Sequence, residues 1–87
     1  MMWTLFIPKR VAKELLACPA VLRKHIEEEL KKLKTDPFPP GCKKLQGLGH
    51  CWRIRVGSHR ILYDPDFKEK VIILLKIGPR RDIYRSL

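Results

Sequence analysis

The sequence predicts an α+β fold, in which an N-terminal strand and a helical hairpin precede an antiparallel sheet of about three further strands. Apolar residues recur at helical spacing in the first half, whereas the second half contains alternating and continuous apolar runs of strand length. A proline-rich segment separates the two patterns. Because neither half of an 87-residue chain could bury a core alone, residues 1–87 are predicted to form a single domain.

The first half is predicted to hold one strand and two helices. Residues 3–7 are rich in strand-forming types and end at Pro8, which cannot continue a ladder. Helices are predicted from Pro8 to Cys18 and from Pro19 to Lys34, where apolar side chains form stripes. The stripes consist of Val11, Ala12, Leu15 and Leu16 in the first helix and Leu22, Ile26, Leu30 and Leu33 in the second.

A connector and a β-hairpin follow. Residues 35–41 contain three prolines, which remove donors and restrict their neighbours, so a helix or a central strand is excluded there. Residues 51–56 alternate apolar and basic side chains, and residues 59–63 form a second strand run. The two residues between them, Gly57 and Ser58, are typical of a tight hairpin loop.

The last strand is predicted to lie in the interior of the sheet. A second turn is expected around residues 64–66, and residues 71–77 form a near-continuous apolar run, which favours a strand buried on both faces. Residues 78–85 are predicted to be a loop or a single helical turn.

The charge of the chain indicates an anionic partner. Nineteen Lys and Arg residues against nine Asp and Glu residues give a net charge of +10. Such a load disfavours compaction by self-repulsion. Nucleic acid is the commonest partner of such a surface, followed by an acidic protein and a membrane surface. A basic surface that serves only solubility is the alternative.

The hairpin loop fixes which residues share a face of the sheet. It places Arg55 opposite Arg60, with Arg53 on the same face. Like charges directly across an antiparallel pair are destabilising, and an anion would relieve that cost. Because guanidinium groups bind phosphate in a bidentate manner, this face is predicted to bind phosphate. The opposite face, against the helices, takes Trp52, Ile54, Val56, Ile61 and Tyr63.

The sequence offers little else that carries chemistry. The three cysteines are odd in number and unpatterned, which fits reduced cytosolic thiols, and no second ligand pair accompanies His50 and Cys51 to hold a metal. No phosphate-binding or dinucleotide-binding glycine motif indicates a cofactor. The short apolar start, which reaches charge at Lys9, fits neither a signal peptide nor a membrane span, so a cytoplasmic protein is expected.

Cleavage of RNA by its own 2′-hydroxyl would need more than arginines. The arginines meet the need to stabilise a highly charged phosphorane, but a proton must also leave the 2′-oxygen and another must reach the leaving 5′-oxygen. His50, His59 and Asp82 are of the usual types, yet His59 is predicted on the core side and Asp82 has arginine neighbours. Tyr84, whose positive surroundings favour the phenolate, is a candidate base or a residue that stacks on a base.

Three segments together resemble the RelE branch of the RelE/ParE toxin superfamily. They are Lys44 to Gly47, Trp52 to Tyr63 and Ile77 to Tyr84. The resemblance spans nearly the whole chain, and the second segment is the most specific. It implies a compact sheet resembling that of microbial RNases, in a toxin of a type II toxin-antitoxin system. It further implies an endoribonuclease that enters the ribosomal A site and cuts mRNA by attack of the 2′-hydroxyl.

The resemblance also implies roles for individual residues. The implied catalytic residues are Arg53, Arg55, Arg60, Arg80 and Tyr84. The implied RNA contacts are Lys43, Lys44, Arg81 and Arg85. Many family members have lysine at the positions of Arg53 and Arg55. Because arginine transfers protons poorly, the role expected at these two positions is phosphate binding.

The partners implied by the resemblance are a RelB-like antitoxin, the ribosome and mRNA, without a membrane. The antitoxin would cover the basic face with a locally acidic segment. Two other functions fit the sequence: a ParE-like inhibitor of DNA gyrase on the same fold, and a non-catalytic basic module that binds nucleic acid.

Overall fold

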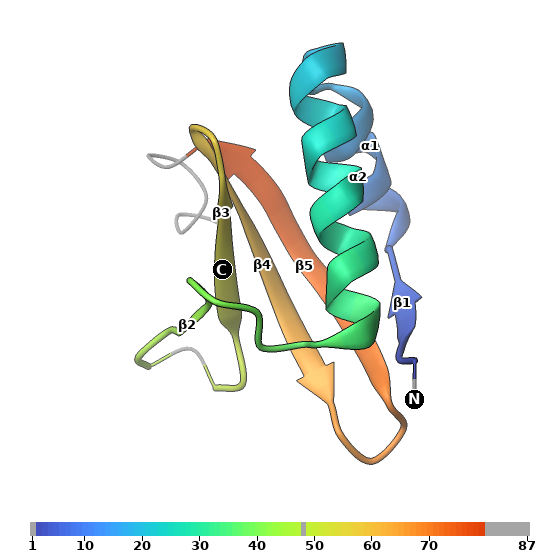
Figure 1. The fold of residues 1–87 in the computed structure, drawn as a ribbon, viewed down its shortest axis with the longest axis vertical. Coiled ribbons are helices and arrows are strands. Elements are labelled where there is room, and N and C mark those ends of the chain that lie inside the picture. The colour runs from blue at the N-terminus through green and yellow to red at the C-terminus, as the bar shows by residue number, and fades with distance from the viewer. Residues whose placement is uncertain (1, 48, 80–87) are drawn as a thin grey trace.

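The computed structural model describes residues 2–47 and 49–79, which form a five-stranded sheet with two helices packed against one of its faces (Figure 1). The predicted α+β class is confirmed. The strands follow the order β1-β5-β4-β3-β2 across the sheet. In chain order the elements are β1 (Thr4–Phe6), α1 (Lys9–Leu16), α2 (Ala20–Thr35), β2 (Lys43–Lys44), β3 (Trp52–Val56), β4 (His59–Asp66) and β5 (Val71–Pro79).

Both helices begin directly after a proline and turn their apolar stripes toward the sheet. α1 buries Val11 and Leu15, and α2 buries three residues of its predicted stripe. Leu16 was predicted to belong to the apolar stripe of α1, but it lies at the last position of this helix and is 68% exposed. On the polar face of α2, Lys32 donates to Glu29 at 3.2 Å.

The hairpin register is the one that its two-residue loop predicts. Val56 pairs with His59 and Arg55 with Arg60, and the pairing continues to Trp52 and Tyr63. Gly57 has φ of +59°, a left-handed conformation that glycine adopts without steric cost. The side chains predicted to face the helices belong to the main core cluster or pack against it.

The predicted turn at residues 64–66 is wrong, because β4 continues through Pro65 to Asp66 and the turn follows it. Pro65 pairs with Ile72 of β5, whereas β3 pairs with β4 only as far as Tyr63. Pro65 therefore has a paired strand on one side only, and its missing N–H does not interrupt the pairing with β3.

β5 lies between β1 and β4, which confirms the prediction of an interior strand. β1 pairs with it in parallel, from Thr4 opposite Val71 to Phe6 opposite Ile73, so the sheet is mixed and not wholly antiparallel. A β-bulge interrupts the pairing of β4 with β5. Leu62 lies opposite Lys76 and Tyr63 opposite Leu74, which leaves Leu75 as the extra residue on β5.

The connector between the layers is fastened to the core by Tyr63. Its hydroxyl donates to the carbonyl oxygen of Pro37 at 2.7 Å, and burial raises the pKa of this tyrosine well above its usual value. Within the connector, the Asp36 carboxylate accepts from the N–H of Phe38 at 2.9 Å. Residues 36–42 thereby hold the end of α2 against the sheet.

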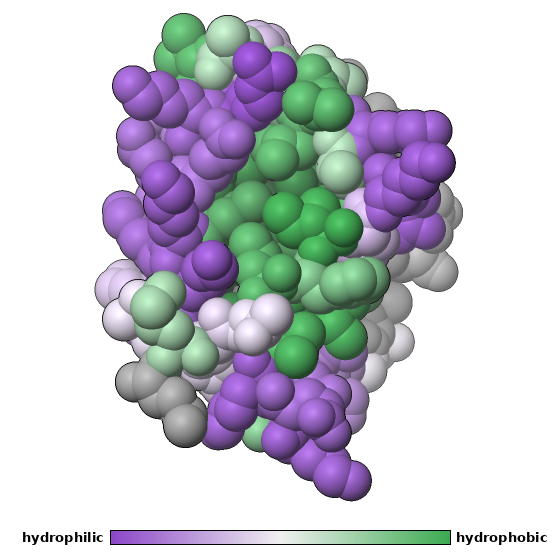
Figure 2. Space-filling model, turned by 90° about the vertical axis from the view of Figure 1, so that its right-hand side faces the viewer, coloured by the Kyte–Doolittle hydropathy of each residue, from purple (hydrophilic) through white to green (hydrophobic). Residues whose placement is uncertain are grey.

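The side of the molecule that carries β1 and the helices exposes an apolar surface bordered by hydrophilic residues (Figure 2). The large apolar side chains that are exposed among the described residues are Met2, Phe6, Leu16, Val21 and Phe67. Within the described ranges, no helix is both long and apolar enough to span a bilayer.

Candidate nucleic-acid interface

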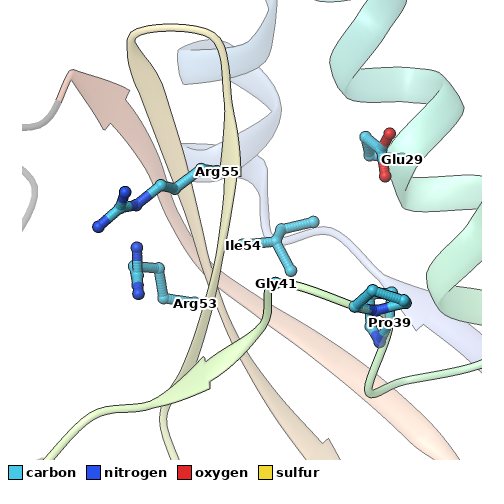
Figure 3. Close-up of a pocket in the computed structure, with 7 residues that line it drawn as sticks. Glu29, Pro39, Gly41, Arg53, Ile54 and Arg55 are labelled. Atoms are coloured by element: carbon cyan, nitrogen blue, oxygen red, sulfur yellow. The ribbon is translucent and has the colours of Figure 1, made fainter.

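Three arginines gather on the face of the sheet that the helices leave uncovered. Arg55 is directly opposite Arg60, and Arg53 is opposite Leu62. Figure 3 shows the Arg53 and Arg55 side chains pointing to the same side of β3, away from Ile54, which points toward α2. We call Arg53, Arg55 and Arg60 the arginine cluster, and its existence confirms the grouping that the hairpin register predicts.

Two members of the arginine cluster are buried, which the sequence does not reveal. Arg53 is 7% exposed and Arg60 is 5% exposed, whereas Arg55 is exposed. The Nη1 atom of Arg53 is buried and has no hydrogen-bond partner in the described part of the chain. A buried charged donor without an acceptor is costly. The face is therefore suited to an anion that supplies acceptor oxygens.

A small apolar cluster lies beside the arginines on the same face. Cys51 and Leu62 are buried in it, and Leu45 and Leu75 pack against them. This burial raises the pKa of the Cys51 thiol, which keeps the sulfur neutral. Because apolar neighbours exclude water, charge interactions at the adjacent arginines are stronger than they would be on a fully solvated surface.

A hollow of about 420 Å³ lies at the edge of β3, between α2 and the connector. Figure 3 shows Glu29 across the hollow from β3, with Pro39 and Gly41 below. The lining residues are Glu29, Pro39, Pro40, Gly41, Arg53, Ile54 and Arg55. Arg53 and Arg55 thus border this hollow from β3, while their guanidinium groups turn toward the other side of the strand (Figure 3).

Of the two predicted RNA-contacting lysines, Lys43 extends the arginine cluster along one row, whereas Lys44 lies on the opposite face with Trp52. Lys43 of β2 pairs with Arg53 and is exposed, and Lys44 pairs with Trp52. Since directly paired residues share a face, Lys43 lies beside Arg53. The remaining predicted residues, Arg80, Arg81, Tyr84 and Arg85, lie outside the described residues.

The histidines considered for proton transfer are not in the arginine cluster. His59 is half-buried and lines a different hollow with Glu14 and Cys18 on the helix side, as its register predicts. His50 is exposed and lines a third hollow with Asp64. Asp82 lies outside the described residues. Among the described residues, no histidine lines the hollow beside Arg53 and Arg55. No described histidine is therefore placed to transfer a proton at the arginine cluster.

Sequence reasoning missed one charged residue on this face, Lys76 of β5. Lys76 is half-buried and pairs with Leu62, which itself pairs with Arg53. Its signal in the sequence was that it is the only charged residue between Val71 and Ile77. The apolar residues around Lys76 favour a core strand, and this pattern hides the single charged residue within it.

The cysteines are free, with Cys18 and Cys51 buried and Cys42 half-buried, as expected for reduced thiols. Among residues 2–47 and 49–79, no group of three or more His, Cys, Asp or Glu side chains is arranged to hold a metal ion.

The architecture is that of a small basic α+β protein with a helical hairpin on one sheet face and an arginine cluster on the other. A family model described as the ParE toxin of the type II toxin-antitoxin system parDE matches residues 6–84. The protein named RelE1 of Methanocaldococcus jannaschii is 34% identical over 83 residues, which cover 92% of each chain. The chain belongs to the RelE/ParE superfamily of toxins from type II toxin-antitoxin systems.

Solved structures of RelE proteins share the fold. The RelE-RelB complex from Pyrococcus horikoshii matches with a TM-score of 0.82 and 32% identity, covering 93% of this chain and 98% of that one. A free RelE toxin mutant of Escherichia coli matches with a TM-score of 0.79 over 93% of this chain and 86% of that one; at 22% identity this likeness concerns the fold alone.

Proposed function

We propose that the protein is a ribosome-dependent endoribonuclease that cleaves mRNA in the ribosomal A site by attack of the 2′-hydroxyl. The observation that carries the proposal is the buried Nη1 atom of Arg53, which lies on the same face as Arg55 and Arg60 and has no hydrogen-bond partner among residues 2–47 and 49–79. Attack on the phosphodiester adds negative charge to the phosphoryl oxygens. Guanidinium groups held in advance at that position stabilise the transition state more than the ground state.

The proposed roles follow the chemistry of each residue type. Arg53, Arg55 and Arg60 bind the scissile phosphate, and Arg80 and Tyr84 complete the catalytic set. Flanking nucleotides are contacted by Lys43, Lys44, Arg81 and Arg85. The products are a 2′,3′-cyclic phosphate, which can open to a 3′-phosphate, and a 5′-hydroxyl. No metal or other cofactor takes part in this scheme.

The proposed protein partner is a RelB-like antitoxin in the same cytoplasm. The Pyrococcus horikoshii relative was solved together with RelB. Two features of this chain support a protein partner. The apolar surface of Figure 2 is of a kind that marks interaction sites, and the net charge of +10 favours an acidic segment.

The proposal is tested by inducing the chain in a bacterial host and mapping cuts by primer extension. One message is translated, and the other is the same message without its start codon. Cuts confined to the translated message, together with growth arrest, are the expected result. Equal cutting of both messages would contradict dependence on the ribosome.

The site residues are tested with variants in the same assay. Replacing Arg55, which is exposed, by Gln removes charge without opening the core, and we expect cleavage to fall about 100-fold or more. Arg60→Ala and Tyr84→Phe are expected to lose toxicity as well. Lys24→Gln, an equal loss of charge at an exposed position of α2, is the control. Full toxicity of both Arg60→Ala and Tyr84→Phe would remove these residues from the site.

A second candidate function is inhibition of DNA gyrase, because the matching family model describes ParE toxins. This function predicts growth arrest and an SOS response while the mRNA stays intact. A non-catalytic basic module would instead bind free nucleic acid in a salt-sensitive manner and cause no growth arrest.

A further inference from the structure

A β-bulge gives the helix-free face a cation that the arginine cluster does not contain. Ile77 and Leu74 both lie in the core on the helix side, so strict alternation would leave room for one residue between them. Two residues, Leu75 and Lys76, stand there because the bulge inserts one. Leu75 packs against Leu62, and Lys76 is the next residue along β5 toward the paired Arg60 and Gly78. Bulges commonly redirect side chains beside functional sites.

Lys76 shares the face with the arginines at short range. The pairing runs in one row from Arg53 through Leu62 to Lys76. Arg60 pairs with Gly78, so Lys76 is its diagonal neighbour on the adjacent strand, at a spacing of about 7–8 Å that long side chains bridge. Gly78 carries no side chain, and a Cβ built there would meet no atom within 4 Å. No side chain at Gly78 therefore separates Lys76 from Arg60, and both Arg60 and Gly78 are buried.

Two side chains of α1 hold the backbone on either side of Lys76. β1 pairs with β5 only as far as Ile73, so the outer edge of β5 needs other partners beyond that point. Arg10 donates from Nη2 to the carbonyl oxygen of Leu75 at 2.8 Å, and the Glu14 Oε1 atom accepts the N–H of Ile77 at 3.0 Å. These bonds fix the peptide groups that flank Lys76, as is expected where a side chain must be positioned accurately.

Proton transfer is what the arginine cluster lacks. A guanidinium stays protonated at every physiological pH, whereas an ammonium group can give up its proton. Two ammonium groups lie in the rows formed by Lys43, Arg53, Leu62 and Lys76 and by Arg55, Arg60 and Gly78. Lys43 is exposed on the two-residue edge strand β2, whereas Lys76 is half-buried on the interior strand β5, diagonal to Arg60.

We propose that Lys76 is a further catalytic residue of the endoribonuclease, which donates a proton to the leaving 5′-oxygen; the inference rests on the proposed function. The 2′-oxygen forms a bond to phosphorus and its proton passes to solvent water. The bond from phosphorus to the 5′-oxygen breaks, and that oxygen takes a proton from the Lys76 ammonium. The products are a 2′,3′-cyclic phosphate, a 5′-hydroxyl and a neutral Lys76 amine, which regains its proton from solvent.

The test measures single-turnover cleavage of mRNA on ribosomes for wild type, Lys76→Met, Lys76→Arg and Lys24→Met. Lys24→Met removes an exposed lysine of α2 and serves as the matched control, and circular dichroism verifies that every variant folds. A second mRNA carries sulfur in place of the bridging 5′-oxygen at the mapped cut. A thiolate leaves without protonation, so this substrate does not need the proposed proton.

On ordinary mRNA, Lys76→Met and Lys76→Arg are both expected to be slower by about 100-fold, the usual contribution of a general acid. On the sulfur-containing mRNA, both are expected to approach the wild-type rate. Restoration of ordinary cleavage by Lys76→Arg would show that charge alone matters, and would overturn the assignment. So would an equal loss on both substrates, or a wild-type rate in Lys76→Met. If the wild type cuts no translated message, the proposed function fails first and the Lys76 assignment fails with it.

Discussion

Replacing the buried Arg53 by Met should make the protein more stable and less active. Arg53 is 7% exposed, its buried Nη1 lacks a hydrogen-bond partner among the described residues, and two further arginines lie on the same face. Methionine keeps much of the length and the apolar stem while removing the charge and the donors. Since the neighbouring Leu62 belongs to an apolar cluster, the new side chain has apolar contacts available.

The magnitude follows from the burial. Leaving a buried donor without an acceptor costs about 1–3 kcal/mol, and more when the group is charged. Replacement of buried charged groups by apolar ones of similar volume has stabilised other proteins by about 1–4 kcal/mol. We therefore expect Arg53→Met to raise the free energy of unfolding by about 1–3 kcal/mol. In a domain of this size each kcal/mol corresponds to about 4–8 °C in the midpoint of thermal unfolding.

The assay is urea denaturation of the isolated protein at constant salt, with the midpoint and the slope fitted separately. Lys24→Met is the matched control: Lys24 is exposed on α2, so its stability should change by no more than about 0.5 kcal/mol. Arg53→Met should lose cleavage of translated mRNA, and Lys24→Met should keep it. If Arg53→Met is less stable than wild type by more than about 1 kcal/mol, the reasoning is refuted, because the guanidinium must then contribute more through its contacts than it costs by its burial.

Two other substitutions test the frame around the site. Tyr63→Phe removes the hydrogen bond to the Pro37 carbonyl and should lower the free energy of unfolding by about 1–3 kcal/mol in urea denaturation. Burial raises the pKa of Tyr63 in the folded protein. The wild type should therefore lose stability as the pH rises above about 10, the pKa of an unfolded tyrosine. An equally steep alkaline loss of stability in Tyr63→Phe would contradict this. Gly57→Ala should cost about 1–2 kcal/mol, because φ is +59° there and the new Cβ would make only an ordinary contact with Leu22 at 3.6 Å. Gly78→Ala, at a position without positive φ or nearby atoms, is its control, and equal losses would show that backbone strain is not the cause.

The hairpin could be predicted in detail because its information is local. A two-residue loop that contains Gly57 permits one register, and that register alone determines that Arg55 faces Arg60 and that His59 points the other way. The helices were predictable for a similar reason, since their apolar stripes and the prolines before them lie within one continuous segment.

What could not be predicted depends on contacts between distant segments. Arg53 pairs with Lys43 of β2, a strand that is only two residues long and leaves no strand pattern in the sequence. The parallel pairing of β1 with β5 joins residues that are 67 positions apart, such as Thr4 and Val71. The bulge at Leu75 is invisible in an apolar run, because every residue before Lys76 suits either face. Pro65 favours the end of a strand by its residue type, but whether the strand ends there depends on where β3 stops.

The arginine cluster also connects activity with inhibition. A face that crowds guanidinium groups lowers the stability of the free protein, and any anion that binds only the folded state returns that stability by mass action. An RNA phosphate and an acidic segment of an antitoxin would satisfy the same donors, so under the proposed function the two compete for one set of side chains. Substitutions in the cluster should therefore weaken both cleavage and antitoxin binding. Lys76→Met should separate the two, because protonation of a leaving group matters to cleavage and not to the binding of a protein. The bulge that positions Lys76 would then serve the reaction alone, while the arginines serve recognition as well.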